Sequence, residues 1–250
     1  MARRYNHRPD AEDRRDRLYI SATHSDATTL PKKVDLRSNC TDVVDQGELG
    51  SCTANAIASG LREYLERKIG PVTRLSRLWL YWMERSIEGT LSEDAGADIR
   101  DGMKVLQKVG CAREEDWPYI IAKFKAAPPT LASVNAAAYK IAEYHRVADL
   151  FSLKAALADG YPVVLGMEVY SSFESSQVEA TGLVPMPKRR ENCLGGHAVL
   201  AVGYIDNISP MGASLVICRN SWGSSWGDKG YFYLPDSYVR AYVTDMWTGK

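Results

Sequence analysis

One cysteine of this chain stands in a setting that could make its sulfur reactive. Cys52 follows Gly50 and Ser51 in the stretch QGELGSCTANA and precedes an apolar pattern typical of a helix. A thiol attacks a carbonyl carbon only as the thiolate, and the positive end of a helix or a nearby imidazolium lowers its pKa. Gln46 could return its amide NH2 beside the backbone N–H of Cys52, and two such donors would hold an oxyanion. The alternative is a small buried residue, which is common for a free cysteine.

A histidine and an asparagine much later in the chain supply the groups that such a thiolate needs. His197 begins an apolar, strand-like stretch behind two glycines, and Asn220 ends the next such stretch. Two consecutive strands of this kind are expected to pair antiparallel, so that the end of one lies beside the start of the other. Asn220 could therefore accept a hydrogen bond from the His197 imidazole, with Trp222 shielding that contact from water. Each residue also has a plainer explanation: a hydrogen-bonded surface histidine, a turn asparagine and a core tryptophan.

The elements that must position these residues divide the chain into a helical part and a later strand-rich part. Apolar residues at helical spacing predict helices within residues 54–68, 75–89, 99–110 and 150–160. β-Branched and apolar runs predict strands over 161–170, 197–206, 213–220 and 230–235. Helices first and strands later indicate an α+β protein.

The first 29 residues differ from the rest of the chain. They are dense in Arg, Asp and Glu and have no sustained apolar period, which is typical of an arm and not of a packed element. Leu18, Tyr19 and Ile20 form a short apolar run that would suit docking into a cleft. Two hypotheses stay open: the arm is a mobile tail, or it covers the site of Cys52 and His197 and restrains it.

Composition argues against several classes of function. Lys plus Arg and Asp plus Glu are both 31, and a net charge of zero argues against a general nucleic-acid binder. No apolar run is long enough for a membrane span, and the absence of a signal peptide favours the cytoplasm, with other export routes left open. The chain has no CxxC or HExxH pattern, so no metal or other cofactor is expected. Its five cysteines leave open whether disulfides form among Cys40, Cys111, Cys193 and Cys218.

Three motifs occur in the order found in papain-like cysteine peptidases, namely QGELGSC, GHAVLAVGY and NSWGSSWGDKGY. The stretch LPKKVDLR, residues 30–37, is similar to the start of the mature enzyme in that family. The resemblance implies a two-lobe α+β fold with a helical lobe over about 40–140 and an antiparallel β-barrel-like lobe over about 141–250. The active-site cleft would lie between them. Residues 30–250 would then form the peptidase domain, and 1–29 a short pro-segment.

The resemblance also implies a reaction and a role for each residue named above. Cys52 would be the nucleophile of a cysteine endopeptidase, paired as thiolate with the His197 imidazolium, and Asn220 would orient the imidazole. Gln46 would complete the oxyanion hole, and Trp222 would shield the site. Peptide bonds of peptide or protein substrates would be hydrolysed through a thioester. No nucleic-acid or membrane partner is implied, and the arm is a candidate intramolecular inhibitor.

The substrate pockets follow from counting along the resemblance. Gapless counting back from Gly110 places Gly96 and Ala97 in the loop that pairs with the substrate backbone. Ala97, Gly166 and Ala198 would line the second substrate pocket. These residues are small and uncharged, which predicts room for an apolar side chain.

Three positions depart from the pattern of the family. Leu49 stands where a disulfide-forming cysteine is usual, Thr53 where the nucleophile is usually followed by Trp, and Gly196 where Asp or Asn usually precedes the histidine. Two other functions use the same residues: an acyltransferase that passes the acyl group to an amine, and a silent homologue that only binds peptides.

Overall fold

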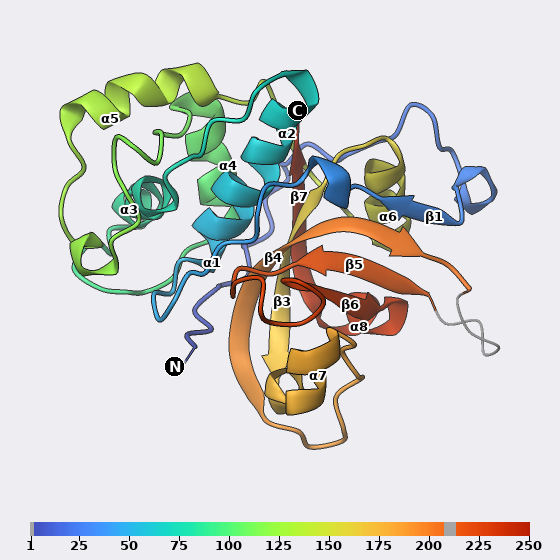
Figure 1. Ribbon diagram of the computed structural model, residues 1–250. Coiled ribbons are helices and arrows are strands. Elements are labelled where there is room, and N and C mark those ends of the chain that lie inside the picture. Colours follow the sequence, from blue (N-terminus) through green and yellow to red (C-terminus); the bar gives the residue numbers. More distant parts are fainter. Residues whose placement is uncertain (1–2, 208–213) are drawn as a thin grey trace.

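The four helices expected from apolar spacing are present in the computed structural model, which describes residues 3–207 and 214–250 (Figure 1). The serine before the second of them caps its helix: Ser76 Oγ accepts a hydrogen bond from Trp79 N at 3.0 Å, and Gly89 ends the helix with a φ of 72°. No helix in the described ranges has the length and apolar character needed to cross a bilayer. The helices of the first half are α1 (Cys52–Ala54), the π-helical η3 (Asn55–Arg62), α2 (Glu63–Ile69), α3 (Arg77–Glu88), α4 (Ile99–Lys108) and α5 (Thr130–Asn135).

The second half is an antiparallel sheet with three short helices on it. The expected strands form, although residue 213 of one of them lies outside the described residues. The strands are β1 (Lys33–Asp35), β2 (Tyr144–Arg146), β3 (Val163–Tyr170), β4 (Cys193–Ile205), β5 (Leu215–Arg219), β6 (Tyr231–Pro235) and β7 (Val243–Gly249). The helices are α6 (Leu150–Ala158), α7 (Ser176–Thr181) and α8 (Asp236–Tyr242).

The strands are hydrogen-bonded into one sheet in the order β2-β7-β3-β4-β5-β6, and β1 pairs with β4. Within the described residues β2 and β6 do not pair with each other, so the sheet stays open and the barrel-like closure expected for this lobe is not seen. β7, which the sequence pattern did not predict, returns from the end of the chain to pair with β3.

β4 is shared by two cores because its side chains alternate between the two faces of the sheet. Ala198 and Leu200 pack toward the helices, whereas Val199 and Ala201 belong to the core on the other face. The helix comes close to this strand at Gly60, where a Cβ would lie 3.1 Å from Leu200 Cδ2. The start of the helical segment is thereby held against the start of β4 (Figure 1).

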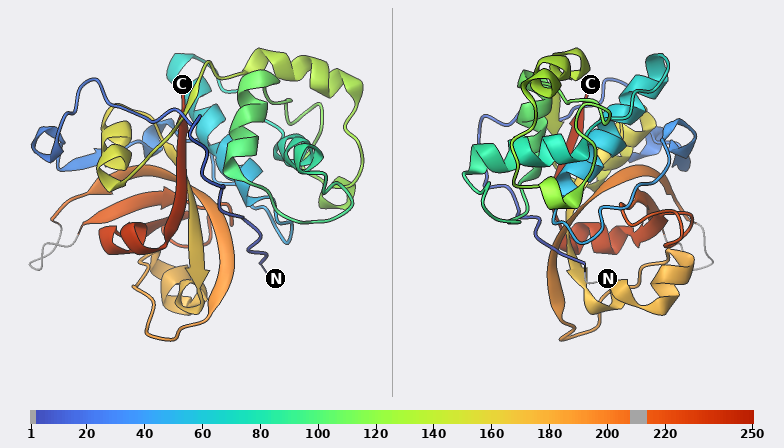
Figure 2. Two further views of the ribbon diagram at one scale, coloured as in Figure 1. Left: turned by 180° about the vertical axis from the view of Figure 1, so that it is seen from behind. Right: turned by 60° about the vertical axis from the view of Figure 1, so that its left-hand side comes forward.

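The N-terminal arm, described from residue 3, is packed along the molecule. Figure 2 shows its dark-blue trace descending between the helices and β4. It forms parallel bridges between Asn6 and Gly196 and between Leu18 and Arg146. The apolar run expected to dock into a cleft lies elsewhere: Tyr19 is buried beside β2, and Leu18 and Ile20 are exposed. Polar residues near the start of the arm occupy the cleft instead.

Candidate active site

Cys52 is the first residue of α1 and is completely buried. Side chains close to it in the chain secure this first turn. Asn55 Nδ2 donates a hydrogen bond to the carbonyl oxygen of Ser51 at 2.8 Å, and Ser51 Oγ shares one with Tyr119 Oη at 2.6 Å. The backbone amides of Thr53 and Cys52 itself face the sulfur, together with that of Ala198 from β4. The thiol therefore lies where a helix start meets the residue after His197.

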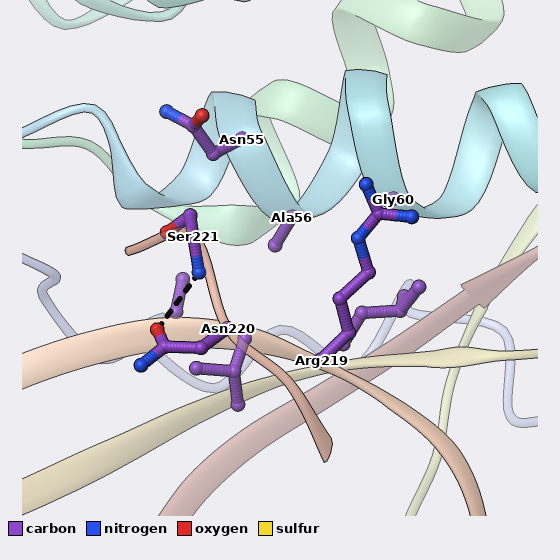
Figure 3. Close-up of a pocket in the computed structure, with 9 residues that line it drawn as sticks. Asn55, Ala56, Gly60, Arg219, Asn220 and Ser221 are labelled. Carbon is purple, nitrogen blue, oxygen red and sulfur yellow. Dashed lines mark hydrogen bonds between the residues drawn. The ribbon is translucent and has the colours of Figure 1, made fainter. Parts of the chain in front are cut away.

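His197 and Asn220 meet as their antiparallel strands predict. His197 Nε2 and Asn220 Oδ1 are 2.9 Å apart, and both side chains are buried. The amide of Asn220 is oriented by its neighbour, because Ser221 N donates to the same oxygen at 2.8 Å (Figure 3). The other ring nitrogen, Nδ1, has no hydrogen-bond partner among the described residues. Trp222 stacks on the imidazole with ring centroids 5.2 Å apart.

Gln46 joins the two sides of the site. Its Nε2 donates to the carbonyl oxygen of Leu49 at 2.9 Å, and its Oε1 accepts from Ser221 Oγ at 2.6 Å. These two contacts orient the buried amide, with its NH2 toward the loop that leads to Cys52. Gln46, Cys52, His197 and Asn220 are thus brought into one place by segments from both halves of the chain.

Burial decides the charge state of the reactive pair. It raises the pKa of the Cys52 thiol to about 12, against the opposing effect of the surrounding amides. It lowers the pKa of His197 to about 4, although the hydrogen bond to Asn220 acts in the other direction. With the arm in place, burial therefore disfavours the charged forms of both Cys52 and His197.

The arm is what closes the site from water. Its Tyr5 ring meets the His197 ring edge-on, with centroids 6.1 Å apart, and the Arg3 guanidinium lies 5.1 Å from the centre of the Trp222 ring. The backbone of the arm pairs with β4: His7 N donates to the carbonyl oxygen of Gly196 at 3.0 Å, and Gly196 N donates to that of Tyr5 at 3.2 Å. The buried state of His197 is thus partly made by residues 3–7.

Side chains of the helical half also grip the arm. Asn6 Nδ2 donates to the carbonyl oxygen of Asp94 at 2.9 Å. Arg8 forms ion pairs with Glu88 and with Asp98. The arm therefore contacts both halves and bridges the cleft between them.

Two of the four predicted substrate-binding residues face the arm. A Cβ on Gly96 would lie 2.0 Å from Asn6 O, and one on Gly166 would lie 1.8 Å from His7 Nε2. Ala198 pairs with Gly166 across β3 and β4 and presents its amide to Cys52. Ala97 is fully buried in the core of the helical half. Gly96 and Gly166 thus lie against the arm, whereas Ala97 belongs to the core, and the role of these residues in binding a substrate stays a prediction.

The departures from the family pattern have structural counterparts. Gly196 leaves space for the arm, because a Cβ there would lie 2.2 Å from His7 O. Thr53 Oγ1 donates to Glu84 at 2.7 Å, and burial raises the pKa of that carboxyl well above its usual range. Leu49 is buried, and all five cysteines are free of disulfides.

A small cavity lies beside the site but is not a substrate pocket. It is bounded by Asn55, Ala56 and Gly60 of η3, by Arg219 at the end of β5 and by Asn220 and Ser221, which follow it (Figure 3). Its volume of about 10 Å³ has room for little more than one water. Residues 3–8 of the arm occupy the larger groove beside it.

Several residues of the site gave no signal in the sequence. Asp245 lies against His7, and Glu174 accepts a hydrogen bond from Tyr5 Oη at 2.5 Å. Asp245 lies in β7, whose mixed polar and apolar pattern did not predict a strand. A scarce histidine in the arm, His7, was the one available sign of this contact.

Comparisons with known proteins agree with this geometry. Residues 30–244 match the model of the papain family of cysteine proteases. An uncharacterized peptidase C1-like protein of Acanthamoeba polyphaga mimivirus is 40% identical over 220 residues, which are 82% of this chain and 68% of that protein. Cathepsin L of Sarcophaga peregrina is 32% identical over 225 residues, which are 86% of this chain and 61% of that protein.

Solved structures show the same fold. The crystal structure of xylellain, a cysteine protease from Xylella fastidiosa, is 38% identical and has a TM-score of 0.88 over 100% of this chain and 98% of that one. A digestive procathepsin L 3 of Tenebrio molitor is 22% identical with a TM-score of 0.73, over 94% of this chain and 73% of that chain, and this likeness concerns the fold alone.

Proposed function

The chain belongs to the papain family of cysteine proteases and is a cysteine endopeptidase, and we propose that Cys52 is its nucleophile and His197 its general base and acid. The contact between His197 Nε2 and Asn220 Oδ1 is the observation that supports these roles. An amide oxygen can only accept, so the proton of the neutral imidazole lies on Nε2. Nδ1 then carries the lone pair that can take the thiol proton.

Peptide-bond hydrolysis follows in two halves. The Cys52 sulfur attacks the carbonyl carbon of the substrate while its proton passes to His197 Nδ1. His197 returns that proton to the leaving amine, which breaks the peptide bond and leaves a thioester. Water, deprotonated by the same nitrogen, then attacks the thioester and releases the acid and the Cys52 thiol.

The charge that develops on the carbonyl oxygen needs fixed donors. We propose the backbone N–H of Cys52 and the amide of Gln46, whose orientation is held by Leu49 and Ser221. Because neither donor has to turn during the reaction, they would stabilise the oxyanion at little reorganisation cost. Trp222, stacked on His197, would keep water from the imidazole–amide contact.

Labelling distinguishes Cys52 from an ordinary thiol. In the chain that begins at Leu30, where the arm no longer covers the groove, an epoxysuccinyl peptide should attach to Cys52, which needs the catalytic geometry, whereas iodoacetamide in excess should reach the exposed Cys193 first. Mass mapping of both products gives the sites. Attachment of the epoxysuccinyl peptide to Cys193 alone would remove Cys52 from the role of nucleophile.

We also propose that the arm holds the enzyme in an inactive state. It lies in the groove, contacts both lobes and covers His197, and burial there keeps the reactive pair neutral. Displacement of residues 3–8 would admit water and substrate together. Water stabilises charged groups, so the pKa of Cys52 would fall and that of His197 would rise toward their ordinary values.

The full chain should be compared with a chain that begins at Leu30, both titrated for reactive thiol. We expect the shorter chain to hydrolyse a small fluorogenic peptide with a higher kcat/KM. Arg15→Ala in the full chain is the matched control: among the described residues this exposed side chain forms its ion pair with Asp13 of the arm, and its removal should leave the rate unchanged. Equal rates for the two chains would make the arm a bystander.

A further inference from the structure

One peptide unit, the bond between Leu49 and Gly50, sets the shape of the loop that leads to Cys52. Its carbonyl oxygen accepts a hydrogen bond from Gln46 Nε2 at 2.9 Å. Its N–H donates to both carboxylate oxygens of Asp94, each at 3.0 Å. Because a peptide unit is planar and trans, its C=O and N–H point in opposite directions, and a group that holds one of them fixes the other. Asp94 therefore sets the direction of the carbonyl group that orients the Gln46 amide.

The Asp94 carboxylate is itself held by helix α3. Tyr81 Oη donates to Asp94 Oδ1 at 2.5 Å, and the same hydroxyl oxygen accepts from Gly96 N at 3.1 Å. Burial, and then the hydrogen bond to Asp94, raises the pKa of Tyr81, so the hydroxyl keeps the proton that it donates. Tyr81 is fully buried and the side chain of Asp94 is nearly so, and water therefore competes little for these bonds. One chain of hydrogen bonds thus runs from the loop before Cys52 through Asp94 and Tyr81 to Gly96.

The segment that carries Asp94 is anchored to the same helix. The buried guanidinium of Arg85, one turn after Tyr81 in α3, donates to the carbonyl oxygens of Leu91 and Glu93, both at 3.1 Å. The guanidinium carbon of Arg85 also lies 4.3 Å from the centre of the Tyr81 ring. Helix α3 therefore holds both the side chain of Asp94 and the backbone just before it, which makes Asp94 a fixed point for the loop.

The loop before Cys52 has no covalent tie to its neighbours. Leu49 stands where the family pattern has a disulfide-forming cysteine, and all five cysteines of the chain are free. Glycine at the next position lets a carboxylate take over this place, because a Cβ on Gly50 would lie only 3.0 Å from Asp94 Oδ1. Hydrogen bonds alone therefore hold this loop, and the bonds to Asp94 are those that reach its central peptide unit.

We propose that Asp94 is a positioning residue that keeps the oxyanion hole in its reactive geometry by holding the peptide unit between Leu49 and Gly50. The inference rests on the proposed function of Cys52 and Gln46. While the Leu49 carbonyl is fixed, the NH2 group of Gln46 and the N–H of Cys52 stay aimed at one point and need no rearrangement as charge develops. Without Asp94 the peptide unit is free to turn, and Gln46 loses the acceptor that orients it.

Two reversible inhibitors measure the oxyanion hole on the full chain, separately from the arm. The Cys52 thiol adds across the C=O bond of a peptide aldehyde, the sulfur to carbon and the proton to oxygen, and this oxygen then lies in the oxyanion hole. The matching peptide alcohol fills the groove without such a bond. Both inhibitors compete with the arm for the same groove, so the ratio of their inhibition constants, alcohol over aldehyde, does not depend on the arm. Saturating substrate also displaces the arm, so kcat does not depend on it either.

Two variants weaken the contact to different degrees. Asp94→Asn places an NH2 group where a carboxylate oxygen accepts from Gly50 N or Tyr81 Oη, so one of these donors loses its acceptor. We expect it to lower both kcat and the ratio about tenfold, because small displacements of a catalytic donor have effects of this order or more. Tyr81→Phe keeps the bond from Gly50 N and removes the one from α3, so it should lower both quantities by a smaller factor.

Two control variants separate this effect from charge and from the arm. Glu93→Gln removes an exposed carboxylate beside Asp94 and should leave kcat and the ratio unchanged. Arg4→Ala removes the side chain of the arm that lies 3.4 Å from Asp94 Oδ2 and keeps the carboxylate. It should therefore change KM, through the docking of the arm, and leave kcat and the ratio as they are.

The outcomes separate this proposal from the proposed function. An unchanged ratio in Asp94→Asn and Tyr81→Phe would overturn the proposal, and so would an equal loss in Arg4→Ala, which would trace the effect to the arm. If Asp94→Asn does not fold, Tyr81→Phe alone decides. If the wild type forms no aldehyde adduct on Cys52, the proposed function fails, and hydrogen exchange of the Gly50 amide still tests the contact. This amide should exchange faster in either variant than in the wild type, and equal exchange would overturn the proposal.

Discussion

On the helical wall of the site, Cys52 is held by residues close to it in the chain, whereas on the sheet wall His197 is held by strands from distant parts of it. Ser51 and Asn55 secure the first turn around Cys52. His197 depends on β4 pairing with β5, which brings Asn220 to it across 23 residues. A local motif can therefore position the proposed nucleophile, whereas the proposed base is usable only if the register of the sheet is correct.

The largest difference in kcat/KM is expected between variants of two buried cysteines, one on each wall of the site. Cys52→Ala should retain the fold but reduce the rate of peptide hydrolysis by several orders of magnitude, because no covalent intermediate can form. Cys218→Ala, in β5, removes another completely buried thiol whose pKa is raised by burial, and it should leave kcat/KM close to wild type. Both are measured with one fluorogenic peptide and with thermal unfolding. Residual activity near wild type in Cys52→Ala would place the reaction elsewhere.

Gln46 tests the contact between the walls. Gln46→Ala should reduce kcat by about 10²–10³, the usual effect of losing one oxyanion donor. Ser221→Ala removes the hydroxyl that orients this amide from the sheet side, and it should reduce kcat less, because the NH2 group remains. Steady-state kinetics separates kcat from KM. A change in KM alone for Gln46→Ala would contradict the proposed role.

Asn220 tests the sheet wall by itself. Asn220→Ala should reduce kcat/KM less than His197→Ala, because Asn220 orients the imidazole without transferring a proton. The loss should nevertheless be clear, since the ring could then turn and place its proton on Nδ1. Side-by-side kinetics of the two variants at several pH values measures this. Equal losses would give Asn220 a larger part in the chemistry.

The smallest expected effect is a change in the stability of the fold, and it comes from Asp10 in the arm, which contacts both walls. Burial and the neighbouring Asp245 raise the pKa of Asp10 to about 6 from an ordinary 3.8. The folded state thus binds more protons than the unfolded state between these values, so this contribution to stability is present below pH 3.8 and is lost as the pH rises through 6. Asp10→Asn should therefore gain stability relative to wild type from pH 4 to pH 7, by at most about 3 kcal/mol.

Thermal unfolding at pH 4, 5, 6 and 7 measures this gain. Asp13→Asn is the control, because Asp13 is only partly buried and its pKa is lowered by Arg15, so no such increase is expected. If the difference in stability between Asp10→Asn and wild type does not change with pH, the Asp10 carboxyl is not buried in solution.

A feature could be predicted from the sequence when it depends on residues that lie close together in the chain. The helices around Cys52 and in α3 and α4 follow from apolar spacing, and β3 to β6 from their β-branched runs. β7 was missed because Thr244 and Asp245 interrupt its apolar pattern, and they are polar because they face the arm. The apolar run of the arm was assigned to the cleft, yet only Tyr19 of it is buried, beside β2.

The sequence by itself predicted Cys52 as the nucleophile, His197 as its base and the order of the elements that carry them, because these predictions depend on residue types and on spacing within one helix or one pair of strands. Only the tertiary structure decided that polar residues of the arm fill the groove and that Asp245 meets His7 across 238 residues. It also decided that burial raises the pKa of the Cys52 thiol and lowers the pKa of His197. The physical reason is that burial and partner choice arise from segments remote in the chain, whose approach no local pattern encodes.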